Sequence, residues 1–223
     1  FISENLNSNY WLLELQKALV NLSLDLEKEG IGHGDIQKGN VIVLKKNKKL
    51  QLKLIDYDGM FVSKMSGDES TELGKTDLQH PKRDKSFFNE KIDRFSIWLI
   101  ITSIETLKYD KSLWNRLTDK GFNDGSNFLF SSKDLSNPAN SKVFKKLNQI
   151  NIDSVKEYLD ILINLCKADI NNISKPELLK SIKKENFSEN KNSLKYSEKI
   201  ISNKRGFNDL KDLLNAGLLT KKE

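Results

Sequence analysis

Residues 33–40, His-Gly-Asp-Ile-Gln-Lys-Gly-Asn, form a polar, glycine-rich stretch that cannot be a regular buried element. Apolar runs that are β-branched or alternate with polar residues follow at Val41–Leu44 and Leu50–Ile55, and a lysine-rich stretch, Lys45–Lys49, separates them. This pattern predicts a β-hairpin with a solvated turn. The second run leads directly into Asp56–Gly59, which reads Asp-Tyr-Asp-Gly, so two polar patches flank one hairpin.

The hairpin predicts that three polar side chains converge. Pairing of its strands brings their open ends to the same edge, which places Asp35 and Asn40 near Asp56. Carboxylate and amide oxygens are the ligands that Mg²⁺ prefers, together with phosphate oxygens. A carboxylate that stays outside the metal shell can accept the proton of a hydroxyl group. The spacing therefore predicts a metal-assisted site at this edge.

These residues resemble a known catalytic layout. Residues 33–40 resemble the catalytic loop of protein kinases, in which an Asn follows the catalytic Asp after five residues, and Asp56 stands where their metal-binding Asp follows the next hairpin. Ile92–Trp98 resembles the start of the buried helix whose Asp grips that loop, and His80-Pro81 falls where a kinase activation segment ends. The His-Gly-Asp form also occurs in aminoglycoside phosphotransferases. Over Asn9–Ala168, the combination most resembles a bacterial protein-kinase-like group.

The resemblance implies a fold that is mainly α with a small β-hairpin (α+β), namely a protein-kinase-like C-terminal lobe over residues 1–170. No glycine-rich phosphate loop and no V-A-I-K-like strand precede the catalytic loop. We therefore expect the N-terminal lobe, which covers the nucleotide, to be absent from this chain and to precede Phe1. Residues 171–223 are expected to form a helical tail that starts near Ser174 and suits docking.

The resemblance also assigns roles to individual residues. Asp35 would orient or deprotonate the acceptor hydroxyl, and Lys38 would neutralise the transferred phosphoryl group. Asn40 and Asp56 would bind Mg²⁺ and, through it, ATP. Asp58 stands where the kinase motif carries a flexible glycine, and its carboxylate either adds a metal contact or points outward.

Two positions depart from the kinase pattern. Gln37 stands where protein kinases carry a Lys, two residues after the catalytic Asp. Gly34 replaces the Arg that in many kinases pairs with a phosphate on the activation loop, so regulation by that route is not expected.

The function expected from the resemblance is an ATP- and Mg²⁺-dependent phosphotransferase that acts on a Ser or Thr hydroxyl of a protein, with this chain inactive by itself. The long loop 60–88 favours a protein substrate. Two alternatives stay open: a small-molecule kinase of the aminoglycoside type, and a pseudokinase or interaction module without turnover.

The composition indicates which partners and which cellular compartment to expect. The chain has 223 residues, a net charge of +6 and one Cys, which excludes an internal disulfide. Its 37 basic residues include only 4 Arg, so a nucleic-acid partner is not expected. The longest apolar run, Ile97–Ile101, is too short to span a bilayer, and we expect a cytoplasmic protein. The apolar pattern further predicts helices at 10–29, capped by Asn9, and at 92–107.

Overall fold

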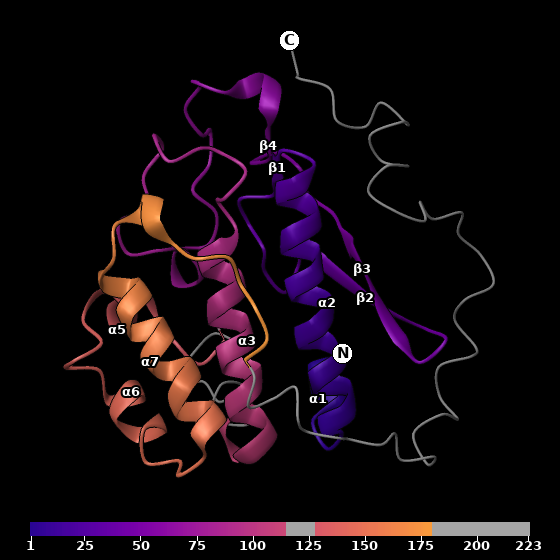
Figure 1. Ribbon diagram of the computed structural model, residues 1–223, viewed down its shortest axis with the longest axis vertical. Coiled ribbons are helices and arrows are strands. Elements are labelled where there is room, and N and C mark those ends of the chain that lie inside the picture. The colour runs from indigo at the N-terminus through magenta and orange to yellow at the C-terminus, as the bar shows by residue number, and fades with distance from the viewer. Residues whose placement is uncertain (115–127, 180–223) are drawn as a thin grey trace. The chain divides into compact units, whose positions relative to one another are not determined.

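The structure is a computed structural model that describes residues 1–114 and 128–179. The chain divides into two units, Phe1–Ser188 and Glu189–Glu223, and the second lies outside the described residues. In the first unit, helices combine with two antiparallel sheets of two strands each (Figure 1). The predicted α+β class is therefore confirmed.

A helix near the N-terminus packs against residues 31–32, which lead into residues 33–40; we call residues 33–40 the catalytic loop after the kinase loop that they resemble. The short α1 (Ile2–Asn5) precedes α2 (Asn9–Lys28), whose residues facing the core include Trp11, Leu15 and Leu19. The N-cap is Ser8 rather than the predicted Asn9, because the Ser8 hydroxyl accepts the N–H of Trp11 at 3.4 Å.

The predicted hairpin is present and is longer than expected. Strand β2 (Val41–Lys46) pairs with β3 (Lys49–Leu54), so the lysines extend both strands. Asn47 and Lys48 form the tight turn between them, and both have positive φ, as a two-residue hairpin turn of this hand requires. Val41 lies opposite Leu54, and the open end of the hairpin therefore carries the two polar patches on its flanks.

A second sheet, which the sequence did not indicate, frames the catalytic loop and the following motif. Strand β1 (Ile31–Gly32) immediately precedes the catalytic loop and pairs with β4 (Phe61–Val62), which follows residues 56–59. The short 3-10 helices η1 (Ser63–Met65) and η2 (Thr76–Leu78) interrupt the loop beyond it.

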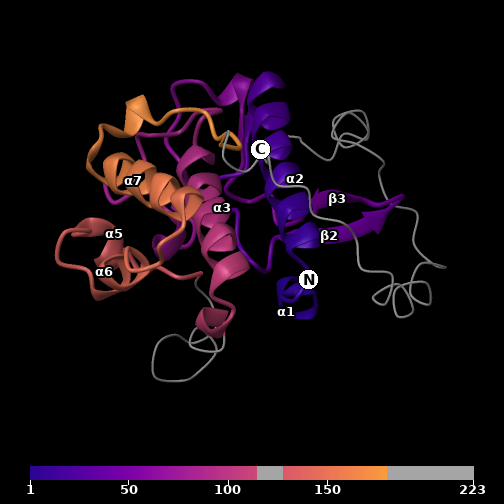
Figure 2. The same ribbon diagram turned by 60° about the horizontal axis from the view of Figure 1, so that its bottom comes forward.

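The predicted buried helix is α3 (Arg94–Tyr109), which lies between α2 and α7 (Asp153–Lys167) in both ribbon views (Figures 1 and 2). All but two of its residues are buried, as the nearly uniform apolar pattern predicts. The remaining described helices are α5 (Ser132–Ser136), α6 (Lys142–Leu147) and the 3-10 helix η3 (Ile170–Asn172). No helix in the described ranges has the length and apolar character needed to cross a membrane.

Polar side chains join the three long helices inside this core. The Glu105 carboxylate lies 2.9 Å from the Lys108 ammonium group and accepts hydrogen bonds from Gln16 at 3.1 Å and from Ser154 at 2.6 Å. Both charged side chains are completely buried, and the ion pair offsets part of the free-energy cost of removing each charge from water.

The predicted helical start at Ser174 is wrong. Residues 173–179 are non-helical and run across the helices. The Trp98 indole N–H donates to the carbonyl of Ser174 at 3.0 Å, and the N–H of Leu179 donates to the Tyr158 hydroxyl at 3.4 Å. Tertiary hydrogen bonds thus replace those of a helix. The rest of the predicted tail, residues 180–223, lies outside the described residues.

Candidate active site

A buried carboxylate holds the backbone of the catalytic loop. Asp93, directly before α3, accepts the N–H of His33 at 2.5 Å on one oxygen and the N–H of Gly34 at 2.9 Å on the other. Asp93 is 3% exposed, and its burial raises the pKa of the carboxyl group, although these two N–H groups act in the opposite direction. The grip that the resemblance implies for this residue is therefore confirmed.

Sequence reasoning missed a partly buried positive charge that interacts electrostatically with this carboxylate. The Arg83 guanidinium donates through Nη1 to the carbonyls of Asp84 and Phe87. Burial lowers the pKa of Arg83, and attraction to the negative charge of Asp93 opposes that shift. Arg83 follows His80-Pro81 by two residues, and this spacing by itself gives no signal of a link to Asp93.

His33 ties the catalytic loop to the end of β3. Its Nδ1 accepts the N–H of Asp35 at 3.3 Å, so Nε2 carries the proton and donates to the carbonyl of Ile55 at 3.1 Å. The imidazole is fully buried and packs edge-on against the ring of Tyr57. Both polar patches are thereby fastened to one ring.

The Asp35 carboxylate is partly exposed and accepts three hydrogen bonds. Gln37 Nε2 donates to Oδ2 at 2.5 Å and Asn40 Nδ2 donates to the same oxygen at 2.9 Å. The N–H of Lys75 donates to Oδ1 at 2.8 Å. Gln37 and Asn40 therefore contact Asp35 from within the loop, whereas Lys38 is exposed.

The backbone places Asn40 and Asp56 at the open end of the hairpin. The N–H of Ile55, the residue before Asp56, donates to the carbonyl of Asn40 at 3.0 Å. Asn40 Nδ2 donates to Asp35, and these hydrogen bonds do not use the amide oxygen, which is the atom that a metal would bind. Asp56 is exposed and has a φ of 66°, a conformation that non-glycine residues adopt rarely and often at functional sites.

The donor set at this end fits Mg²⁺. Asp56 offers a carboxylate and Asn40 an amide oxygen, both hard ligands, and phosphate oxygens would complete the shell. Within residues 1–114 and 128–179, no three His, Cys, Asp or Glu side chains cluster as a metal site of their own. Asp58 is exposed, and its carbonyl accepts the Thr71 hydroxyl at 3.4 Å.

Gly34 is required by the local geometry. Its φ is 80°, and a Cβ atom built on it would lie 2.8 Å from the carbonyl oxygen of Gly59. Any larger residue would push the catalytic loop away from residues 56–59. The absence of the Arg that kinases carry at this position therefore has a steric reason in this chain.

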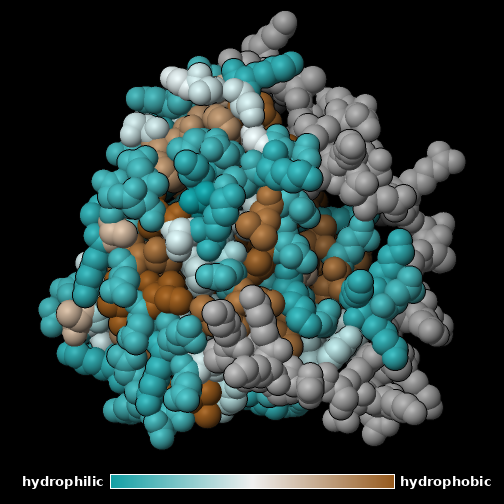
Figure 3. Space-filling view, viewed as in Figure 1, coloured by the Kyte–Doolittle hydropathy of each residue, from teal (hydrophilic) through white to brown (hydrophobic). Residues whose placement is uncertain are grey.

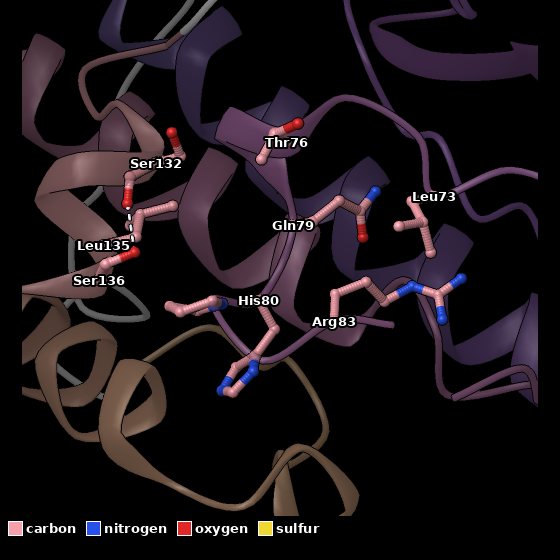
Figure 4. Close-up of a pocket in the computed structure, with 9 residues that line it drawn as sticks. Leu73, Thr76, Gln79, His80, Arg83, Ser132, Leu135 and Ser136 are labelled. Atoms are coloured by element: carbon pink, nitrogen blue, oxygen red, sulfur yellow. Dashed lines mark hydrogen bonds between the residues drawn. The ribbon is translucent and has the colours of Figure 1, made fainter. Parts of the chain in front are cut away.

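A small pocket lies between residues of the 73–83 stretch and residues of α5 (Figure 4). Its volume is about 110 Å³, and the close-up shows that α5 supplies one wall. His80 Nδ1 accepts the N–H of Lys82, and Nε2 donates to the Leu165 carbonyl at 2.9 Å. The imidazole therefore has a structural role. The lining residues are Leu73, Thr76, Gln79, His80, Pro81, Arg83, Ser132, Leu135 and Ser136.

Comparisons with known proteins add no relative to these observations. No protein-family model matches the chain, and no curated protein or solved structure is significantly similar to it.

Proposed function

We propose that this chain is the catalytic lobe of an ATP- and Mg²⁺-dependent phosphotransferase that modifies a Ser or Thr hydroxyl of a protein. One observation carries the proposal: the loop with Asp35 and the hairpin end with Asn40 and Asp56 are fastened into one unit by His33 and Asp93. Phosphoryl transfer depends mainly on positioning and charge neutralisation, which such a unit can supply.

Each residue has a separate task in this proposal. Asp35 accepts the hydroxyl proton while the acceptor oxygen bonds to the γ-phosphorus and the bond to the ADP oxygen breaks. Asn40 and Asp56 hold the metal, which, when bound, neutralises phosphate charge. Lys38 would have to turn inward from its exposed position in order to assist.

Two exposed isoleucines near Asp56 and Asn40 support the proposal that a nucleotide binds here. Ile55 directly precedes Asp56 and is 41% exposed, while Ile42, two residues after Asn40, is 42% exposed. Figure 3 shows that hydrophilic residues cover much of the described surface in that view, with apolar residues between them. We propose that the base and the N-terminal lobe expected before Phe1 cover these isoleucines.

Binding and turnover test separate parts of the proposal. In a protein that joins this chain to that N-terminal lobe, Asp56→Ala should weaken Mg²⁺-dependent ATP binding at least tenfold in calorimetry. Asp35→Ala should abolish phosphate transfer and preserve ATP affinity. Asp58→Ala shows whether Asp58 contributes a metal contact, because only the loss of a metal ligand would weaken Mg²⁺-dependent ATP binding. Unchanged binding in Asp56→Ala would contradict the metal assignment.

The pseudokinase alternative has one observation in its favour. A neutral amide, that of Gln37, contacts Asp35 where protein kinases place a cation. A pseudokinase would bind Mg²⁺ and ATP but transfer no phosphate to protein. Transfer to an aminoglycoside in place of a protein would instead indicate a small-molecule kinase.

A further inference from the structure

A loop segment far along the chain closes over the catalytic loop. We define it as the 73–79 segment, and it makes two hydrogen bonds to consecutive residues of that loop. The N–H of Lys75 donates to Asp35 Oδ1 at 2.8 Å, and the buried Gln79 amide donates to the Gly34 carbonyl at 2.9 Å. About 40 residues of sequence separate the partners in each bond.

Gly74 makes this approach possible. Its φ is 67°, and a Cβ atom there would lie 2.5 Å from the carbonyl oxygen of Gly34 and 2.8 Å from Asp35 Oδ1. A side chain at this position would therefore meet the backbone and the carboxylate that the segment contacts. The segment can lie against the loop only because residue 74 is a glycine.

We propose that the 73–79 segment is a backbone clamp that orients the Asp35 carboxylate toward the acceptor hydroxyl, with Gly74 and Gln79 as its positioning residues. Gln37 and Asn40 hold one carboxylate oxygen from within the catalytic loop, and the N–H of Lys75 holds the other from outside it. With both oxygens held, the carboxylate cannot rotate away. The catalytic role of Asp35 rests on the proposed function, whereas the clamp itself is a structural statement.

The kinetic test uses two glycines of the same loop. In the protein that joins this chain to the N-terminal lobe, Gly74→Ala should lower kcat about 100-fold, since misplacement of a reacting group by about 1 Å costs that much. The KM for ATP should change less than twofold. Gly67→Ala is the matched control: the φ of Gly67 is also positive, at 92°, yet no atom lies within 4 Å of the added Cβ. Equal kcat values for the two variants would overturn the clamp.

A second measurement does not depend on turnover. The Lys75 amide should exchange slowly with deuterium in the 223-residue chain and at least tenfold faster in Asp35→Ala, which removes its acceptor. Gly67→Ala should leave its exchange rate unchanged. If Asp35→Ala leaves the Lys75 rate unaltered, the clamp is wrong, even where Gly74→Ala fails to fold. If exchange behaves as expected but the wild-type chain joined to the N-terminal lobe transfers no phosphate, the clamp stands and the proposed function is wrong.

Discussion

Replacing Asp93 with Asn tests how the catalytic loop is held in place. In the wild type, each carboxylate oxygen accepts one buried backbone N–H, from His33 at 2.5 Å and from Gly34 at 2.9 Å. Asn has nearly the same volume but one acceptor, so its NH₂ group must face one of these donors. A buried N–H left without a partner costs about 1–3 kcal/mol, and the bond that survives loses its ionic character. We therefore expect Asp93→Asn to lower the free energy of unfolding by about 2–4 kcal/mol.

The measurement is urea unfolding of the chain, followed by tryptophan fluorescence and far-UV circular dichroism. The control is Asp25→Asn, an exposed carboxylate on α2 that should change the free energy of unfolding by no more than about 0.5 kcal/mol. If Asp93→Asn unfolds at the same urea concentration as this control, the carboxylate does not hold the loop, and the reasoning that joins α3 to the site fails.

Three further predictions concern stability. Gly34→Ala should destabilise the chain by at least about 1 kcal/mol, because of its φ of 80° and a clash of 2.8 Å. Gly39→Ala, where a Cβ meets no atom within 4 Å, should not; similar denaturation midpoints for the two would refute this. Burial lowers the pKa of His80 below its ordinary 6.5, so the stability that the neutral imidazole contributes should be lost as pH falls below 6.5. The decrease in the free energy of unfolding from pH 7.5 to 5.5 should therefore be smaller in His80→Gln than in the wild type. Glu105→Ala should cost about 3–5 kcal/mol by leaving Lys108 buried without its carboxylate, and Glu105→Leu combined with Lys108→Met should recover most of it in the same urea assay.

Local patterns were sufficient for much of the fold. The apolar period predicted α2 and α3, and β-branched alternation predicted the hairpin of β2 and β3. These signals are strong because each element buries one face, or all faces, over many residues. The hairpin predicted that Asp35, Asn40 and Asp56 lie near one another. In the structure Asn40 donates to Asp35, and Asp56 directly follows Ile55, whose N–H donates to the Asn40 carbonyl.

Other features could not be read from such patterns. Strands β1 and β4 have only two residues each, too few for any period to be visible, and their pairing joins segments about 30 residues apart. At Ser174 the local helix signal was present, but hydrogen bonds from Trp98 and to Tyr158 stabilise a non-helical path. Tertiary contacts overrode propensity there.

The sequence by itself determined which chemical groups are available: the carboxylate of Asp35, an amide five residues later and a second carboxylate after a hairpin. Only the tertiary structure decided how the first of these is held. Gln37 contacts Asp35 while Lys38 is exposed, and the N–H of Lys75 reaches Asp35 from a distant loop. The physical reason is that a backbone N–H has no sequence signature, and its partner is set by how closely two segments can approach. Gly74 allows that approach, and its role becomes apparent only when both segments are seen together.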